Sequence, residues 1–83
     1  MSFKSKYIIV KQGAITIPVV FGDAAKHSDV ARGFMPAVIV GAGFCHINVD
    51  GQYDCYGEST SLNIKSNGEA DSKMLNTFLG VDY

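Results

Sequence analysis

The fold is decided by residues 44–56, which read FCHINVDGQYDCY. Two runs of aromatic, β-branched and cysteine residues flank the central Asn-Val-Asp-Gly, and this composition predicts two antiparallel strands joined by a tight turn. Two turn geometries are open. In a two-residue loop, Asp50 and Gly51 form a type I′ turn. In a three-residue loop, Asn48 opens a type I turn and Gly51 takes the left-handed position.

The three-residue loop is favoured, because asparagine is preferred at the first position of a type I turn and a type I′ turn needs a positive φ at Asp50. A shift of one residue changes every neighbour across the hairpin. In the other register, Cys45 faces Tyr56 and His46 faces Cys55. The favoured register predicts three opposed pairs: Cys45 with Cys55, His46 with Asp54, and Ile47 with Tyr53.

A second hairpin is predicted before this one. The strand-like runs at residues 7–10 and 14–21 are separated by a turn at Gln12 and Gly13. Pro18 lies inside the second run. Because proline has no N–H to donate to a neighbouring strand, we expect this strand at an edge of the sheet or bent at Pro18.

The near-continuous apolar start of residues 37–48 predicts a central strand that is buried on both faces. Gly41 and Gly43 interrupt it, and a glycine inside a strand marks a bulge or a close approach of another backbone. Residues 52–56 are its hairpin partner. Residues 59–64 either extend that partner or start another short strand.

A short helix is predicted near residues 28–33, with Ser28 as its N-terminal cap and Gly33 at its end. A start near Asp23, which would include His27, is also open. His27, next to Ser28, is expected to be a solvent-facing loop residue.

A C-terminal helix is predicted between a cap at Asn67 and an end at Gly80. Its apolar positions follow helical spacing and are expected to form its core face: Met74, Leu75, Phe78 and Leu79. The order of elements is therefore ββ(α)ββα. This order predicts one α+β domain over residues 1–83, with an antiparallel sheet of two β-hairpins and the C-terminal helix packed on one face.

Charge and hydropathy exclude several classes of partner. Seven Lys and Arg stand against eight Asp and Glu without a run of either sign, so no nucleic-acid partner is expected. The longest apolar stretch, residues 34–45, contains Pro36 and is shorter than the about 20 residues of a membrane span. No signal peptide is recognised. We therefore expect a cytoplasmic protein without a membrane partner, whose two cysteines stay reduced.

Candidate binding residues fall into two groups. The favoured register brings His46, Asp54 and Tyr56 onto one polar face. A histidine oriented by an aspartate belongs to general-base chemistry, but no nucleophile stands beside this pair, so an ordinary cross-strand pair is favoured. Phe34 and Met35 lie in a predicted loop before Pro36, and two large apolar residues exposed there would suit an interface.

No catalytic, metal or cofactor site is predicted. Neither CxxC nor HxxxH spacing occurs, which argues against zinc. The Gly-Ala-Gly at residues 41–43 does not open a helix, as a nucleotide-binding loop would. Residues 57–61, which contain Ser59, lack the second glycine of a nucleophile elbow.

Short motifs in the second half of the chain carry a resemblance to a known group of proteins. They are Gly43-Phe44, Asp50-Gly51 and residues 56–59, 61–62, 64–66 and 75–80, with residues 15–21 matching more loosely. With these motifs the chain resembles small accessory proteins of bacteriophages, prophages and similar mobile elements. The resemblance implies a bacterial cytoplasmic setting and no catalytic residue. By analogy at the level of the class, it implies binding to a host protein.

The leading hypothesis is therefore a small non-enzymatic protein that binds a host protein or a second copy of itself as a homodimer. The alternative is a small-molecule or nucleotide-binding module that uses the polar face around His46, Asp54 and Tyr56. A third hypothesis, an enzyme, would use His46 with Asp54, or Ser59.

Overall fold

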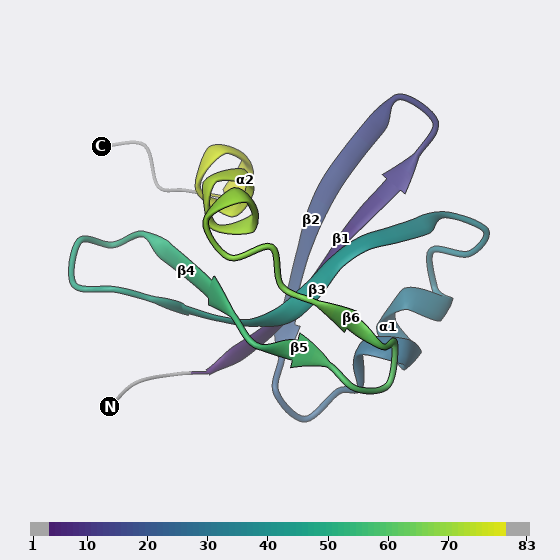
Figure 1. The fold of residues 1–83 in the computed structure, drawn as a ribbon, viewed down its shortest axis with the longest axis horizontal. Coiled ribbons are helices and arrows are strands. Elements are labelled where there is room, and N and C mark those ends of the chain that lie inside the picture. Colours follow the sequence, from purple (N-terminus) through teal and green to yellow (C-terminus); the bar gives the residue numbers. More distant parts are fainter. Residues whose placement is uncertain (1–3, 80–83) are drawn as a thin grey trace.

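The computed structural model describes residues 4–79 and contains a four-stranded antiparallel sheet with the order β2-β1-β3-β4 (Figure 1). Its strands are β1 (Ser5–Gln12), β2 (Ile15–Gly22), β3 (Val38–Ile47) and β4 (Tyr53–Tyr56). The helices are α1 (His27–Arg32) and α2 (Glu69–Leu79), and β5 (Glu58–Ser59) and β6 (Ile64–Lys65) form a separate two-stranded ladder. The predicted α+β fold, with two hairpins and a C-terminal helix, is confirmed.

The first hairpin joins β1 and β2 through a two-residue turn between Gln12 and Ile15. Gly13 has a φ of 63°, which suits a glycine at the first central position of a hairpin turn. Pro18 of β2 pairs with Ile9 of β1, and β2 forms one edge of the sheet. The edge position predicted from the proline is confirmed.

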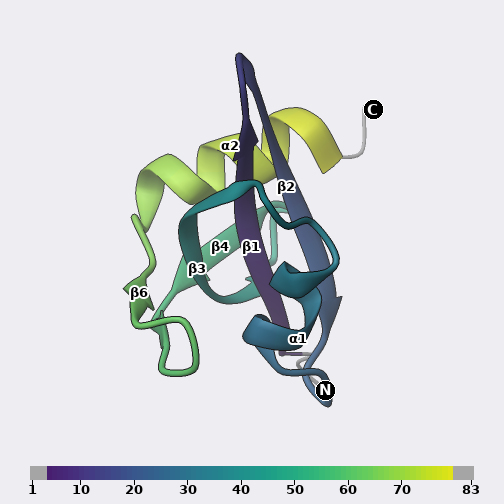
Figure 2. The same cartoon turned by 90° about the vertical axis from the view of Figure 1, so that its right-hand side faces the viewer.

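The sheet carries a hydrophobic layer on each face. One layer lies under α2 and contains Tyr7, Ile9, Cys45, Cys55 and Leu75. The other lies on the side of α1 and contains Ile8, Val10, Ala31, Ala37 and Ala42. Successive residues of a strand point to opposite faces, so the four buried residues of β1 are divided between the two layers. Figures 1 and 2 show α2 between β2 and the β3–β4 hairpin and α1 close to the end of β2.

The beginning of β3 differs from the prediction. Val38 and Val40 are exposed, so the predicted burial on both faces is wrong for this part of the strand. A bulge accounts for part of this, because β1 pairs with Ile39 and then with Gly41 and leaves Val40 without a partner. The glycine pattern had predicted such an irregularity, and that expectation is confirmed.

Helix α1 begins one residue before the predicted cap. It starts at His27, and Lys26 in the cap position makes no side-chain capping bond. The prediction of Ser28 as the cap is wrong, because Ser28 is the second residue of the helix. The helix includes His27, as the longer alternative expected, but it does not start near Asp23. The Ser28 backbone N–H lies 3.3 Å from the Ser61 hydroxyl. Gly33 ends the helix, as predicted.

Fewer apolar residues of helix α2 pack against the sheet than its apolar pattern predicts. Leu75 is fully buried and Met74 packs beside it, whereas Phe78 and Leu79 are exposed. The core-face prediction is therefore wrong for the last two residues, and the predicted end at Gly80 lies outside the described residues. Neither described helix is long and apolar enough to cross a membrane.

The start of α2 is also built differently from the prediction. Asn67 lies two residues before the helix, and its side chain donates to the Val40 carbonyl at 3.2 Å rather than capping α2. Its backbone N–H donates to Asp71 Oδ2 at 2.9 Å, so the carboxylate of the first turn reaches back to the preceding segment.

Candidate functional site

The turn of the second hairpin has the favoured three-residue form. Asn48 N donates to Gln52 O at 2.8 Å, and Gly51 N donates to Asn48 O at 3.0 Å. Gly51 has a φ of 78°, the left-handed conformation expected of glycine at this position. The register is the predicted one: Cys45 faces Cys55, His46 faces Asp54, Ile47 faces Tyr53, and Phe44 faces Tyr56.

This register gathers four side chains into what we call the polar–aromatic face: Phe44, His46, Asp54 and Tyr56. His46 Nε2 lies 3.7 Å from Asp54 Oδ2, and the His46 and Tyr56 ring centroids are 5.5 Å apart. The rings of Phe44 and Tyr56 stack at 6.0 Å. The predicted grouping of His46, Asp54 and Tyr56 is confirmed as an arrangement in space.

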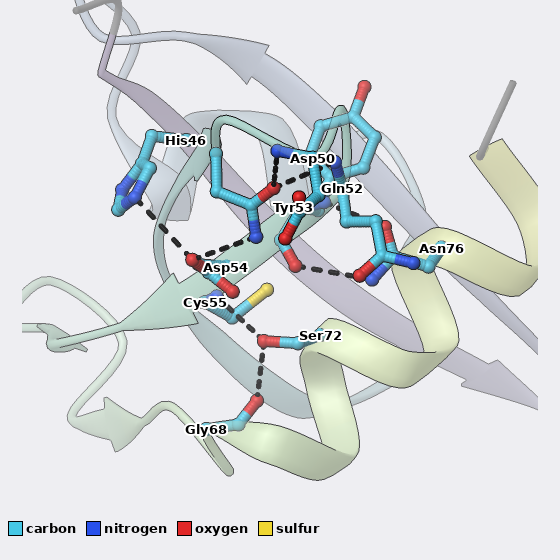
Figure 3. A network of polar contacts seen from close by, with 10 residues as sticks. His46, Asp50, Gln52, Tyr53, Asp54, Cys55, Gly68, Ser72 and Asn76 are labelled. Atoms are coloured by element: carbon cyan, nitrogen blue, oxygen red, sulfur yellow. Dashed lines mark hydrogen bonds and ion pairs between the residues drawn. The ribbon is translucent and has the colours of Figure 1, made fainter.

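Asn48 fixes the carboxylate of this face. Its Oδ1 accepts hydrogen bonds from Asp50 N at 2.9 Å and Gln52 N at 3.1 Å, and its Nδ2 donates to Asp54 Oδ2 at 3.2 Å (Figure 3). One side chain therefore closes the turn and orients Asp54. Sequence reasoning assigned Asn48 to the turn but missed its bond to Asp54.

The Ser59 form of the enzyme hypothesis is not supported. Ser59 is fully buried, and its Oγ accepts a hydrogen bond from Leu62 N at 3.2 Å within the turn between β5 and β6. A hydroxyl held in this way has no open approach for a substrate. His46 and Asp54 share one face, but both are substantially exposed, and such a pair contributes little to stability.

The prediction that His27 faces solvent is wrong, because His27 is buried with only 4 % of its surface exposed. Its Nε2 lies 2.7 Å from the Gly43 carbonyl. A carbonyl only accepts, so Nε2 carries the proton and donates it. The ring meets Phe21 and Phe44 edge to face, at centroid distances of 5.5 and 5.8 Å. His27 thereby links α1 to β3, a role that sequence reasoning missed.

Phe34 and Met35 lie apart from the polar–aromatic face. Met35 precedes the start of β3, whereas His46 lies near the other end of this ten-residue strand. Met35 is exposed, as predicted. Phe34 is half-buried and packs against the hydrophobic layer on the α1 side, so its predicted exposure is wrong.

The two cysteines are free thiols in the layer under α2. Burial, and then the neighbouring Cys55, raise the pKa of the Cys45 thiol to about 12. Burial also raises the pKa of Cys55 to about 11. Cys55 N donates to Ser72 Oγ at 2.8 Å and so points away from β3, which makes the two cysteines a non-hydrogen-bonded pair.

A buried polar cluster on the same side ties α2 to the sheet. The Tyr7 hydroxyl lies 2.5 Å from Asp71 Oδ2, to which it donates, and 2.6 Å from Ser66 Oγ. Burial raises the Tyr7 pKa well above its usual value, and the hydrogen bond to Asp71 raises it further. Asp71 also lies against Gly41, where an added Cβ would be 2.8 Å from Oδ2. This cluster was not predicted, because its members lie far apart in the sequence.

Within residues 4–79, no three His, Cys, Asp or Glu side chains lie together in a way that could hold a metal ion. Comparison with protein-family models, curated proteins and solved structures finds no match to the chain. The resemblance to phage accessory proteins therefore stays a prediction.

Proposed function

We propose that this protein is a non-enzymatic interaction protein that binds another protein molecule through one end of its sheet. The observation that carries the proposal is a group of large apolar side chains at this end, with exposed fractions between 37 and 66 %. We call this group the hairpin-end surface, and its residues are Ile15, Ile17 and Met35.

The strand register places these residues at the same end of the molecule. Lys11 pairs with Thr16 on one side and with Val38 on the other, so the start of β2 and the start of β3 flank the end of β1. Met35 lies in the turn that leads into β3. Lys11 and Gln12 are exposed beside the apolar residues and supply polar groups at the margin, as in the rims of protein interfaces.

Exposed apolar side chains favour burial against a partner. Fully burying a wholly exposed side chain of this size contributes about 1.5–3 kcal/mol, and these partly exposed side chains would contribute a fraction of that. Gathered exposed apolar residues mark interaction surfaces. The partner class is a host protein or a second copy of the chain. The resemblance to phage accessory proteins agrees with such a role at the level of the class.

The experiment compares Ile17→Lys and Met35→Lys with the matched control Val49→Lys, which lies fully exposed in the β3–β4 turn. Size-exclusion chromatography with light scattering at high micromolar concentration measures self-association. A quantitative pull-down from bacterial lysate measures binding to a host protein. We expect one of these interactions in the native chain and in Val49→Lys, and its loss in the two hairpin-end variants.

A strictly monomeric native chain that retains no lysate protein would contradict the proposal. Equal retention by all three variants would contradict the assignment of the surface, since the control carries the same change of a large apolar residue to lysine.

A further inference from the structure

A pocket of about 380 Å³ opens where β1, β3, α1 and the β5–β6 turn meet. Its volume lies within the about 300–1,000 Å³ typical of small-molecule sites. Two ammonium groups, two hydroxyls and two rings line it: Lys6 and Lys26, Thr60 and Ser61, His27 and Phe44. The pocket adjoins the polar–aromatic face through Phe44 and lies apart from the hairpin-end surface.

Lys6 is an unusual residue for its position. It lies on β1, an inner strand, and is paired with Phe21 on one side and Phe44 on the other. Its side chain is half-buried, and Nζ donates to the Ala25 carbonyl at 2.8 Å. Over the described residues 4–79, no carboxylate comes within 4.0 Å of Nζ. A partly buried charge without a counter-ion is costly, and a bound anion would supply one.

The surroundings add positive charge and hydrogen-bond donors. Lys26 supplies a second ammonium at the pocket and, like Lys6, has no ion-pair partner within the described part of the chain. Lys4 Nζ lies 4.1 Å from the centroid of the Phe44 ring. Ser61 Oγ accepts from Ser28 N at 3.3 Å and lies 3.4 Å from Ser59 Oγ, so with Ser59 as the donor in that contact the Ser61 proton points to a ligand.

We propose that this pocket binds a small phosphate monoester. The phosphate lies between the ammonium groups of Lys6 and Lys26 and accepts from Ser61, and the apolar part of the ligand packs against Phe44. A phosphate dianion matches two ammonium groups and a hydroxyl donor in charge and in acceptor number. Glu58 also lines the pocket and repels any anion there, so the two lysines and Glu58 together leave one net positive charge, which suits a single phosphate group better than a polyanion such as nucleic acid.

The test is an NMR titration of the ¹⁵N-labelled full-length chain at pH 8 and low salt, with phenyl phosphate and inorganic phosphate as probes. Saturable shifts are expected at Lys26, His27, Phe44 and Ser61, with phenyl phosphate binding at least fivefold more tightly than phosphate. Lys6→Met and Lys26→Met should each weaken binding of phenyl phosphate tenfold or more. Lys11→Met, farther along β1, is the matched control and should bind like the native chain.

Shifts spread evenly over Lys11, Lys65 and Lys73 would overturn the proposal, since they would indicate non-specific binding to surface lysines. Native affinity in Lys26→Met would also overturn it. If Lys6→Met does not fold, Lys26→Met still tests whether the pocket binds phosphate. Lys26 is exposed and makes no packing contribution to the hydrophobic layers, so its replacement should leave the fold intact. Equal affinities for the two probes would overturn the packing of the ligand against Phe44.

Discussion

The side chain of Asn76 supplies Tyr53 with both hydrogen bonds that a further strand would supply. Its Oδ1 accepts from Tyr53 N at 2.6 Å, and its Nδ2 donates to Tyr53 O at 3.2 Å (Figure 3). A carboxamide carries the same donor and acceptor as a peptide group. Ser72, one turn earlier on α2, accepts from Cys55 N and donates to Gly68 O at 3.0 Å. Helix α2 thereby closes the outer edge of β4, where an open edge would pair with other chains.

Asn76→Ala should lower the free energy of unfolding by about 1–3 kcal/mol, because both backbone groups of Tyr53 lose their partner. Urea unfolding measures this change, and hydrogen exchange should be faster at the Tyr53 amide. Thr77→Ala is the control, since Thr77 is exposed and its hydroxyl donates to Lys73 O within the same helix. Equal stability of the two variants would show that the Asn76 side chain does not hold the edge.

The two histidines should respond very differently to substitution by leucine. His27→Leu removes the buried hydrogen bond to the Gly43 carbonyl and should cost about 1 kcal/mol or more of stability. His46→Leu removes the exposed pair of His46 Nε2 and Asp54 Oδ2, which lie 3.7 Å apart. The free energy of unfolding should change by no more than about 0.5 kcal/mol. Thermal or urea unfolding compares them. The assignment of His27 as a structural residue is wrong if the two variants unfold alike.

Gly43→Ala should destabilise the fold by about 1–3 kcal/mol or more, because overpacking of this kind forces the backbone to shift. The added Cβ would lie 2.5 Å from the Tyr56 carbonyl oxygen and 3.2 Å from Ser66 Cβ. Gly22→Ala is the matched control, since a Cβ there meets nothing within 4 Å and its φ is not in the left-handed region. A Gly43→Ala protein as stable as this control would contradict the close approach of β4 to β3 at this point.

Stability should fall at alkaline pH. In the folded chain the pKa of Cys45 is raised from 9.0 to about 12 and that of Cys55 from 9.0 to about 11. A raised folded pKa means that the protonated thiols contribute stability below about pH 9, and this contribution is lost as the pH rises toward 12. Urea unfolding under reducing conditions at pH 8 to 11 measures the slope.

The thiols themselves provide a second measurement of the same property. At pH 8, a thiol-specific reagent should react slowly with both cysteines of the folded chain and rapidly in urea, since the thiolate is the reactive form. Cys45→Ala/Cys55→Ala should flatten the alkaline slope without removing it, because the raised pKa of Tyr7 contributes in the same direction. Rapid reaction in the folded state would contradict the burial of the pair.

The parts of the fold that depend on local chemistry were predictable from the sequence. The residue types at Asn48 and Gly51 specify one turn, and the turn specifies which side chains of the hairpin meet. Proline chemistry likewise placed β2 at an edge. In both cases the deciding interactions lie within a few residues of one another, so neighbouring residues were enough to decide between alternatives.

The parts that depend on distant contacts were not predictable. The burial of His27 requires a carbonyl 16 residues away, and the bonds between Tyr53 and Asn76 span 23 residues. Nothing in the residues around His27 shows that β3 passes beside it. Phe78 and Leu79 follow the helical apolar pattern but are exposed, because periodicity gives the face of a helix and not how far the underlying sheet extends.

Strand β1 belongs to both hydrophobic layers at once, with Tyr7 and Ile9 in one and Ile8 and Val10 in the other. Neither hydrophobic layer can lose its packing without moving β1, which also contributes residues to the other layer. The helix on each face is therefore anchored to a common support, and unfolding should occur as a single all-or-none transition without a state in which one half survives.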